Sequence, residues 1–283
     1  MIGTKSLTFS REAFEGRLHH CRIHINNFLA AQPVPPETFT ALELGTGWFP
    51  TIAIGLYLCG AGKTWIIDID PLLRSSRIQQ VVQFFCEYDD RNELQKFLPR
   101  VRRDRLDHLR KSLPFVQKES PEQFLQRLDI HPMVRDAQVT GLPEQSVDLI
   151  FSTGVLEYIP RPVLQGILAE FKRISSKRSI MSHWIIVVDQ FAWFDRSITP
   201  FNYLKYSNRQ WRYLDSPLIS QSRLRICDFR EMFKKAGFEI LSEENESGHP
   251  SDLDKIRLAS EFQGYSRDDL LVLKSWMVTR PLV

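Results

Sequence analysis

The chain has 283 residues, of which 43% are hydrophobic and 25% are charged, and its net charge is +3. This is ordinary globular composition, and the charge by itself is too small to indicate a nucleic-acid partner. No apolar run approaches the ~20 residues that span a bilayer, and charges recur through Arg22 where a signal peptide would be apolar, so we expect a cytoplasmic protein outside the membrane.

Residues 8–30 are predicted to form a helix. Ser10 is a candidate N-cap, and apolar residues follow at helical spacing: Phe14, Leu18, Cys21, Ile25 and Phe28. His20 and His24 are four residues apart, but no carboxylate completes a metal-binding motif, so a polar helix face is favoured and no metal is expected. The four cysteines share no close spacing and are interpreted as reduced thiols. A stiff proline-containing linker, residues 32–37, leads into the first strand.

The stretch Phe39–Pro50 predicts a strand, a glycine turn and a helix start. Glu43 lies inside the apolar run, which breaks at Gly45-Thr46-Gly47. Glycines at such a turn let the backbone approach a ligand closely. Asp68 stands near the end of the next predicted strand, Thr64–Ile69, about 20 residues further on, where an acid can accept both hydroxyls of a ribose.

This stretch resembles the first motif of class I S-adenosylmethionine-dependent methyltransferases, whose pattern is acid-x-Gly-x-Gly. Pro50 stands where a dinucleotide fingerprint requires a third small residue, which argues against a dinucleotide site. A dehydrogenase and a purely structural turn remain alternatives. The resemblance implies S-adenosylmethionine as cofactor, with contacts from Glu43, Gly45, Thr46, Gly47, Trp48, Asp68 and Ile69.

A second block, Asp136 to Pro160, resembles the other half of that cofactor site. Strands are predicted at residues 129–135 and 147–152. The resemblance implies that Asp136 contacts the adenine amino group, that Ala137 lies against the ring, and that Ser152, Thr153 and Gly154 line the methionine moiety. The family usually has histidine where this chain has Tyr158, which is kept as a candidate catalytic residue.

Two insertions are predicted, at residues 89–127 and 189–226. In the first, residues 91–118 hold nine basic residues against three acidic ones, a local charge of +6. The segment is either a solvated helical cap or a surface for an anionic partner. The second insertion is rich in aromatic residues and forms either a packed subdomain or an acceptor pocket over the sulfonium.

Asp189, after the predicted strand Trp184–Val188, and His183, just before it, are candidate general bases. Each also has a structural interpretation, as a turn cap for Asp189 and as a hydrogen-bonded core residue for His183. Helix-forming sequence follows at residues 228–236. The ending Ala236-Gly237-Phe238 is typical of the same family, with strand six opening there and strand seven at residues 270–278.

The alternation of strands and helices predicts an α/β fold with a doubly wound, mostly parallel sheet, and the resemblance implies seven strands with an antiparallel last strand. A helical N-terminal lid with its linker (residues 1–38) precedes the cofactor-binding domain (residues 39–283), which carries the helical cap. The segment 242–269 is interpreted as a surface excursion. Glu43–Gly47, Asp68, Asp136, Ser152 and Asp189 are expected to converge at the carboxyl ends of the strands, where ligands bind in such sheets.

The expected function is an S-adenosylmethionine-dependent transferase that methylates a small-molecule acceptor. One alternative of the same fold attacks Cγ of the cofactor and releases methylthioadenosine, for example by cyclisation to azetidine-2-carboxylate. A nucleoside-binding scaffold and an RNA-directed methyltransferase using residues 91–118 are further alternatives, although nucleic acid is disfavoured because that segment has few aromatic residues for base stacking.

Overall fold

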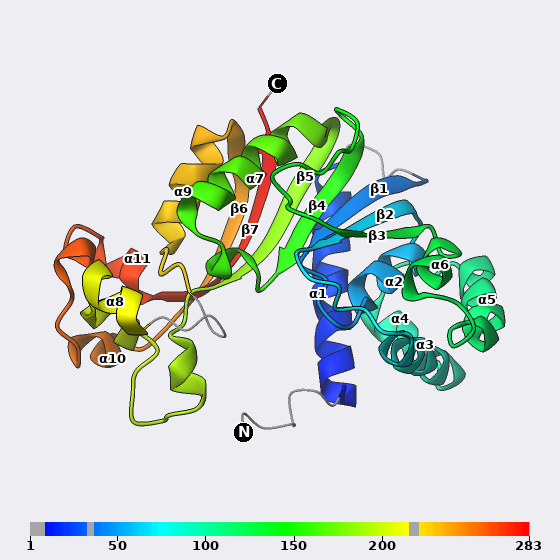
Figure 1. Cartoon of the computed structure of the whole chain (residues 1–283), viewed down its shortest axis with the longest axis horizontal. Coiled ribbons are helices and arrows are strands. Elements are labelled where there is room, and N and C mark those ends of the chain that lie inside the picture. The colour runs from blue at the N-terminus through cyan, green and yellow to red at the C-terminus, as the bar shows by residue number, and fades with distance from the viewer. Residues whose placement is uncertain (1–8, 33–36, 215–220, 283) are drawn as a thin grey trace. The chain divides into compact units, whose positions relative to one another are not determined.

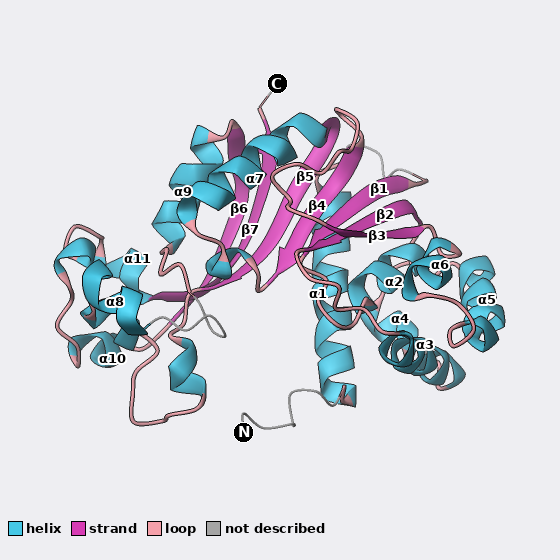
Figure 2. Cartoon of the chain, viewed as in Figure 1, coloured by secondary structure: helices cyan, strands magenta, loops and turns pink. Residues whose placement is uncertain are grey.

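The computed structural model describes residues 9–32, 37–214 and 221–282. Most of the predicted linker, and the expected helix start at residue 8, therefore lie outside the described residues. Within these ranges seven strands form one mixed sheet of order β3-β2-β1-β4-β5-β7-β6 (Figures 1 and 2). β1 pairs in parallel with β2 and β4, β2 pairs in parallel with β3, and β7 pairs antiparallel with β6. The predicted fold class is confirmed.

The strands have the following bounds: β1 Phe39–Leu44, β2 Ala61–Asp68, β3 Ile130–Val134, β4 Val147–Thr153, β5 Ser175–Ile186, β6 Phe238–Ser247 and β7 Val272–Pro281. The α-helices are α1 Arg11–Ala30, α2 Thr51–Leu58, α3 Ser75–Asp90, α4 Leu94–Phe97, α5 Arg103–Ser112, α6 Pro121–Gln126, α7 Arg161–Ile174, α8 Asn208–Leu214, α9 Ile226–Lys235, α10 Pro250–Asp254 and α11 Arg267–Leu271. None of the helices in the described ranges is long and apolar enough to cross a bilayer.

Several predicted boundaries were wrong. β5 begins at Ser175, nine residues before the predicted start. The polar first residues of this strand are held in place because the Arg178 guanidinium contacts Asp148 at 2.8 Å. The sequence Asp70-Pro71 also predicts a helix start, but α3 begins at Ser75, because a tight turn in which the Leu72 amide donates to the Asp70 carbonyl at 2.9 Å comes first. Residues 154–160, which have helix-forming sequence, contain only one 3-10 turn, Leu156–Tyr158.

The chain divides into two compact units, residues 1–152 with 174–182 and residues 153–173 with 183–283. In the first unit α1 packs against α2, α3 and α4, and its role as a lid stays a prediction. The Ser10 hydroxyl caps α1 by accepting the Ala13 amide at 3.2 Å, and the predicted apolar stripe of α1 is buried. A Cβ at Gly55 would lie 2.7 Å from the Cys21 sulfur, so glycine is what lets α1 and α2 approach.

The basic segment 91–118 builds α4, α5 and their connections in the first unit, and its cations are largely used internally. Arg103 and Arg110 contact the buried Asp89 at 2.9 and 2.7 Å, and Arg105 donates to the Tyr57 carbonyl at 2.7 Å. Arg102 pairs with Asp104 at 3.1 Å. These contacts favour the interpretation as a helical cap, and an anionic partner at this segment stays a prediction.

The second unit contains a helical subdomain made of two segments, residues 198–214 and 250–271. In Figure 1, α8, α10 and α11 lie together in it. Its core is Phe201, Tyr203, Leu204, Trp211, Leu253, Phe262 and Leu270. The interpretation of residues 242–269 as a surface excursion was therefore wrong: the segment begins as the last half of β6 and then supplies half of a hydrophobic core.

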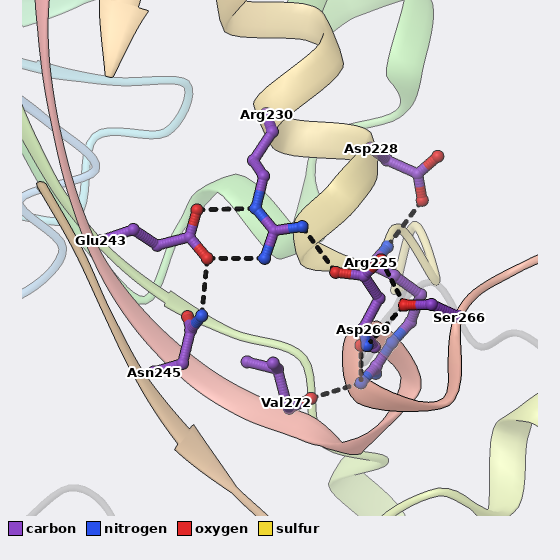
Figure 3. A network of polar contacts seen from close by, with 8 residues as sticks. All are labelled: Arg225, Asp228, Arg230, Glu243, Asn245, Ser266, Asp269 and Val272. Atoms are coloured by element: carbon purple, nitrogen blue, oxygen red, sulfur yellow. Dashed lines mark hydrogen bonds and ion pairs between the residues drawn. The ribbon is translucent and has the colours of Figure 1, made fainter. Parts of the chain in front are cut away.

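A polar network anchors this subdomain to β6 and β7 (Figure 3). Arg225 is fully buried and donates to the carbonyls of Val187 and Leu270, each at 2.7 Å. Arg230 on α9 holds Glu243 of β6 with two hydrogen bonds of 2.7 Å and contacts Asp269 at 2.5 Å. Buried backbone carbonyls need such donors, because an unpaired one costs about 1–3 kcal/mol.

Candidate functional site

The glycine turn after β1 has the conformation that its sequence requires. Gly45 and Gly47 have φ angles of +76° and +67°, in the left-handed region that side chains with a Cβ rarely adopt. A Cβ built on Gly47 would find no atom within 4 Å. The backbone therefore faces open space at the predicted position, as expected where a ligand approaches closely.

Asp68 is the last residue of β2 and is tied to this turn. Its Oδ2 accepts the Gly47 amide at 3.0 Å, and its Oδ1 lies 3.4 Å from the Asp70 amide. The parallel register places Leu44 beside Ile67, so the two strand ends are neighbours. The predicted pairing of glycine turn and acid is thus a direct contact in the first unit.

A cavity of about 260 Å³ opens at this contact. Thr46, Gly47 and Asp68, all predicted from sequence, line it. Sequence reasoning missed Asp70, Arg74 and Glu122, which also line it. Asp70 and Arg74 were hidden because the loop between β2 and α3 was predicted to be helical. Glu122 comes from the first turn of α6, inside an insertion that was interpreted as a helical cap or as a surface for an anionic partner.

Glu43 lies beneath the turn and is buried. Its carboxylate accepts the Thr46 hydroxyl at 3.0 Å. Burial raises the pKa of Glu43 to about 7, which the Thr46 hydrogen bond and the positive charge of Arg17 only partly offset. Arg17 on α1 was not predicted; burial lowers the pKa of its guanidinium, and Glu43 opposes that shift. Glu43 therefore orients the turn from below rather than lining the cavity.

Two predicted apolar contacts are exposed in this unit. The Arg77 guanidinium lies 4.9 Å from the centre of the Trp48 ring, which occupies one face of that indole by a cation–π contact. Ile69, directly after Asp68, is 68% exposed. An exposed isoleucine beside a cavity offers an apolar surface for a flat ring, so its predicted cofactor contact is kept.

The ends of β3 and β4 carry the remaining predictions of the first unit. Asp136 is exposed, and its carboxylate accepts the Gln138 amide at 2.8 Å, while Ala137 is buried beside it. Ser152 is buried and stands in register with Leu44. Neither Asp136 nor Ser152 lines the cavity, so their cofactor contacts stay predictions.

The other predicted residues belong to the second unit. Thr153 and Gly154 end β4, and Gly154 has a φ of +65°. Glu157 follows in the 3-10 turn; neither of its buried carboxyl oxygens has a hydrogen-bond partner among the described residues. Burial raises the pKa of Glu157 to about 8, an effect that the nearby amides of Glu157 and Ile186 only partly offset. Sequence reasoning missed Glu157, because its neighbours in the sequence are typical of a helix and do not indicate a buried carboxyl group.

Tyr158 is 37% exposed, and its hydroxyl accepts a hydrogen bond from the Gln190 side chain. Burial raises the pKa of Tyr158 to about 12, so this hydroxyl stays protonated at neutral pH. It can therefore donate a hydrogen bond to a ligand, and its predicted catalytic role stays a prediction.

The two candidate bases are both buried. Asp189 caps a 3-10 turn: its carboxylate accepts the Phe191 amide at 2.9 Å and the Asn202 side chain at 3.1 Å. Burial raises its pKa. His183 stacks on Phe233 with ring centres 5.7 Å apart, and burial lowers its pKa to about 3. These environments favour the structural interpretation of both residues, and their roles as bases stay predictions.

Several aromatic residues of the second insertion pack against one another. Phe201, Tyr203 and Trp211 belong to the core of the helical subdomain. Trp193 and Phe194 are exposed. These positions favour the interpretation as a packed subdomain, and the alternative of an acceptor pocket stays a prediction. Among the described residues no cluster of three or more His, Cys, Asp or Glu side chains could hold a metal ion.

Comparisons with known proteins rest on structure. No family model matches the chain, and no curated protein matches it. A protein from Galdieria sulphuraria, provisionally described as a sarcosine dimethylglycine methyltransferase, superposes with a TM-score of 0.50 at 13% identity, covering 96% of this chain and 88% of its own. A methyltransferase from Methanosarcina mazei gives a TM-score of 0.48 at 12% identity, covering 88% and 94%.

At such low identity only the fold is shared, and the first of these similarities is the one that supports it. In this chain the strand order places β7, which is antiparallel to β6, between β5 and β6. The chain has the Rossmann-like α/β fold of class I S-adenosylmethionine-dependent methyltransferases.

Proposed function

We propose that this protein is an S-adenosylmethionine-dependent transferase that methylates a small-molecule acceptor. The observation that carries the proposal is the contact between the Gly47 amide and Asp68 at a cavity, on neighbouring strand ends. An acid held in this way presents oxygen atoms that can accept the hydroxyls of a ribose.

The residues present fit a nucleoside cofactor. Gly47 leaves space where a Cβ would stand, and the exposed Ile69 next to Asp68 supplies an apolar surface for adenine. Asp68 would hold the ribose, and Thr46 and Gly47 would contact the cofactor through the turn. When bound, S-adenosylmethionine supplies an activated methyl carbon and its own leaving group, so the protein has to bind, orient and exclude water.

Methyl transfer from S-adenosylmethionine does not always require a general base from the protein. Glu43, which has a pKa of about 7, is buried under the turn and orients Thr46. Its position fits a structural role in holding the turn in its ligand-ready shape. This leaves the acceptor's own nucleophile to carry the reaction, with proton removal where the acceptor requires it.

The test combines binding and product analysis. The purified protein is titrated with S-adenosylmethionine by calorimetry and then incubated with it, and the products are followed by mass spectrometry. We expect binding without consumption in the absence of an acceptor, and S-adenosylhomocysteine once a methylatable small molecule is added.

Two other outcomes are informative. Formation of methylthioadenosine and azetidine-2-carboxylate without any acceptor would show that the cofactor's own amine attacks its Cγ. That reaction would then replace methyl transfer as the proposed activity. Absence of binding in calorimetry would refute the proposal altogether, because both reactions need the same cofactor.

A further inference from the structure

A second, larger cavity lies within the helical subdomain. Its volume is about 760 Å³, inside the range of about 300–1,000 Å³ that is typical of small-molecule sites. Both segments of the subdomain contribute to its lining, residues 197–210 from one and residues 255–263 from the other. No predicted site residue lines it, so the function proposed above does not account for it.

The lining of this cavity is positively charged. Lys205, Lys255 and Arg257 line it, whereas no aspartate or glutamate does. Lys255 is neutralised by Asp252 at 2.7 Å. Lys205 and Arg257 are exposed and have no ion-pair partner in the described part of the chain. Two cations with no paired carboxylate at a concave surface attract an anionic group.

Two carboxylates, one before the first segment and one in the second segment of the subdomain, already accept hydrogen bonds. Asp189, whose pKa the charge of Lys205 lowers slightly against the effect of burial, accepts hydrogen bonds from Phe191 and Asn202. Glu261 accepts the Asn208 amide at 2.6 Å. These carboxylates have their own donors, so they leave Lys205 and Arg257 available to a ligand.

Neutral donors complete the lining. The Gln210 side-chain oxygen accepts both the amide and the hydroxyl of Ser207, at 2.8 and 3.0 Å. This orientation leaves the NH₂ group of Gln210 as a donor. Tyr206 is the one aromatic residue of the lining, so the surface suits a polar ligand better than an extended apolar one or stacked bases.

The walls of the cavity are fixed before any ligand binds. The Ala259 amide donates to the Leu204 carbonyl at 2.9 Å, which joins the two segments directly. Behind the lining, Arg223 packs its guanidinium over the rings of Trp211 and Phe262, at 5.1 and 5.2 Å. A preformed site loses little conformational entropy on binding.

We propose that this cavity binds a small polar ligand through an anionic group, a carboxylate or a phosphate, held by Lys205 and Arg257. The proposal is independent of the cofactor, because every residue that it uses lies in the helical subdomain.

The test uses the full-length protein and two probes, inorganic phosphate and succinate, in calorimetric titrations without S-adenosylmethionine. We expect one of them to bind, and Lys205→Met or Arg257→Gln to weaken that binding about tenfold each, because each substitution removes one charged hydrogen-bond donor. Arg209→Gln is the matched control, because Arg209 is exposed on α8 outside the lining. Binding of phosphate alone or of succinate alone identifies the anionic group.

Hydrogen exchange locates the binding. Phosphate or succinate should protect amides in residues 197–210 and 255–263 and leave the loop at residues 69–75, beside the first cavity, unchanged. The proposal is overturned if neither probe binds, if both variants bind as the wild type does, or if the protection appears only at the first cavity, where Arg74 is the cation.

Discussion

Replacing Arg225 by methionine should strongly lower the free energy of unfolding of the helical subdomain, although the two side chains are similar in length. Arg225 is fully buried, and methionine keeps its apolar length but has no donor. Arg225 donates to the carbonyls of Val187, Leu270 and Val272 and to the Tyr203 hydroxyl, at 2.7 Å for Val187 and Leu270. It therefore joins the residue after β5, the first segment of the subdomain and the start of β7. Figure 3 shows its contact with Val272.

The magnitude follows from which acceptors lose their donor. The Val187 carbonyl keeps the Tyr203 hydroxyl at 2.7 Å, so it is not left unpaired. Leu270 and Val272 lose the Arg225 donor, and at about 1–3 kcal/mol for each buried unpaired carbonyl the loss is about 2–6 kcal/mol. This is a large part of the free energy of unfolding of a typical protein, which is about 5–15 kcal/mol.

The assay is urea denaturation followed by fluorescence, together with native-state hydrogen exchange. In Arg225→Met we expect a lower midpoint and lost protection in residues 198–214 and 250–271, while β1, β2 and β3 keep theirs. Arg209→Met, an exposed replacement of the same kind, should change the free energy of unfolding by less than about 0.5 kcal/mol. Equal midpoints and equal protection in the two variants would refute the assignment of Arg225 as the residue that holds the subdomain.

Three further changes test the first unit and the turn after β4. Asp68→Ala should weaken S-adenosylmethionine binding about 10- to 100-fold in calorimetry. Asp68→Asn should have an intermediate affinity because it keeps an acceptor for the Gly47 amide. An affinity of Asp68→Ala equal to that of the wild type would contradict the proposed cofactor site. Burial raises the pKa of Glu157 from 4.5 to about 8, so the folded state holds an extra proton between these values. The free energy of unfolding should then fall as pH rises through that window, by up to about 1.4 kcal/mol per pH unit. Glu157→Gln should remove this part of the slope in denaturation curves, and an identical slope would count against a buried, unpaired carboxyl; Glu43 contributes with the same sign in both proteins. Ser10→Ala should cost about 1 kcal/mol of stability by removing the cap of α1, and an unchanged midpoint would show that this cap contributes nothing in solution.

The core of the fold was predictable because the relevant signals are local. Strand ends carry their acids and glycines in the sequence itself: Gly47 and Asp68 are 21 residues apart and make a hydrogen bond. The apolar stripe of α1 was likewise predicted. The glycine turn and this stripe depend on turn chemistry and periodicity, which short windows of sequence contain. The antiparallel pairing of β6 with β7 was instead implied by the resemblance to a known fold.

The helical subdomain was not predictable for the opposite reason. Its core joins residues 201–211 to residues 253–270, and nothing local marks such a pairing. An aromatic run has the same composition whether its rings face a ligand or a core. Arg225, a charged residue in the sequence, is fully buried because backbone carbonyls from distant segments meet at its guanidinium.

The same long-range pairing explains where the second cavity comes from. Helices shorter than about 12 residues are marginal alone, and α8, α10 and α11 have seven, five and five residues. They persist because they share one core, and the surface left between the two segments is polar and cationic. Anion binding should therefore be lost together with the subdomain in Arg225→Met and be kept in Asp68→Ala. If Arg225→Met lost protection in the subdomain yet still bound phosphate or succinate with wild-type affinity, the cavity would not be the site of binding.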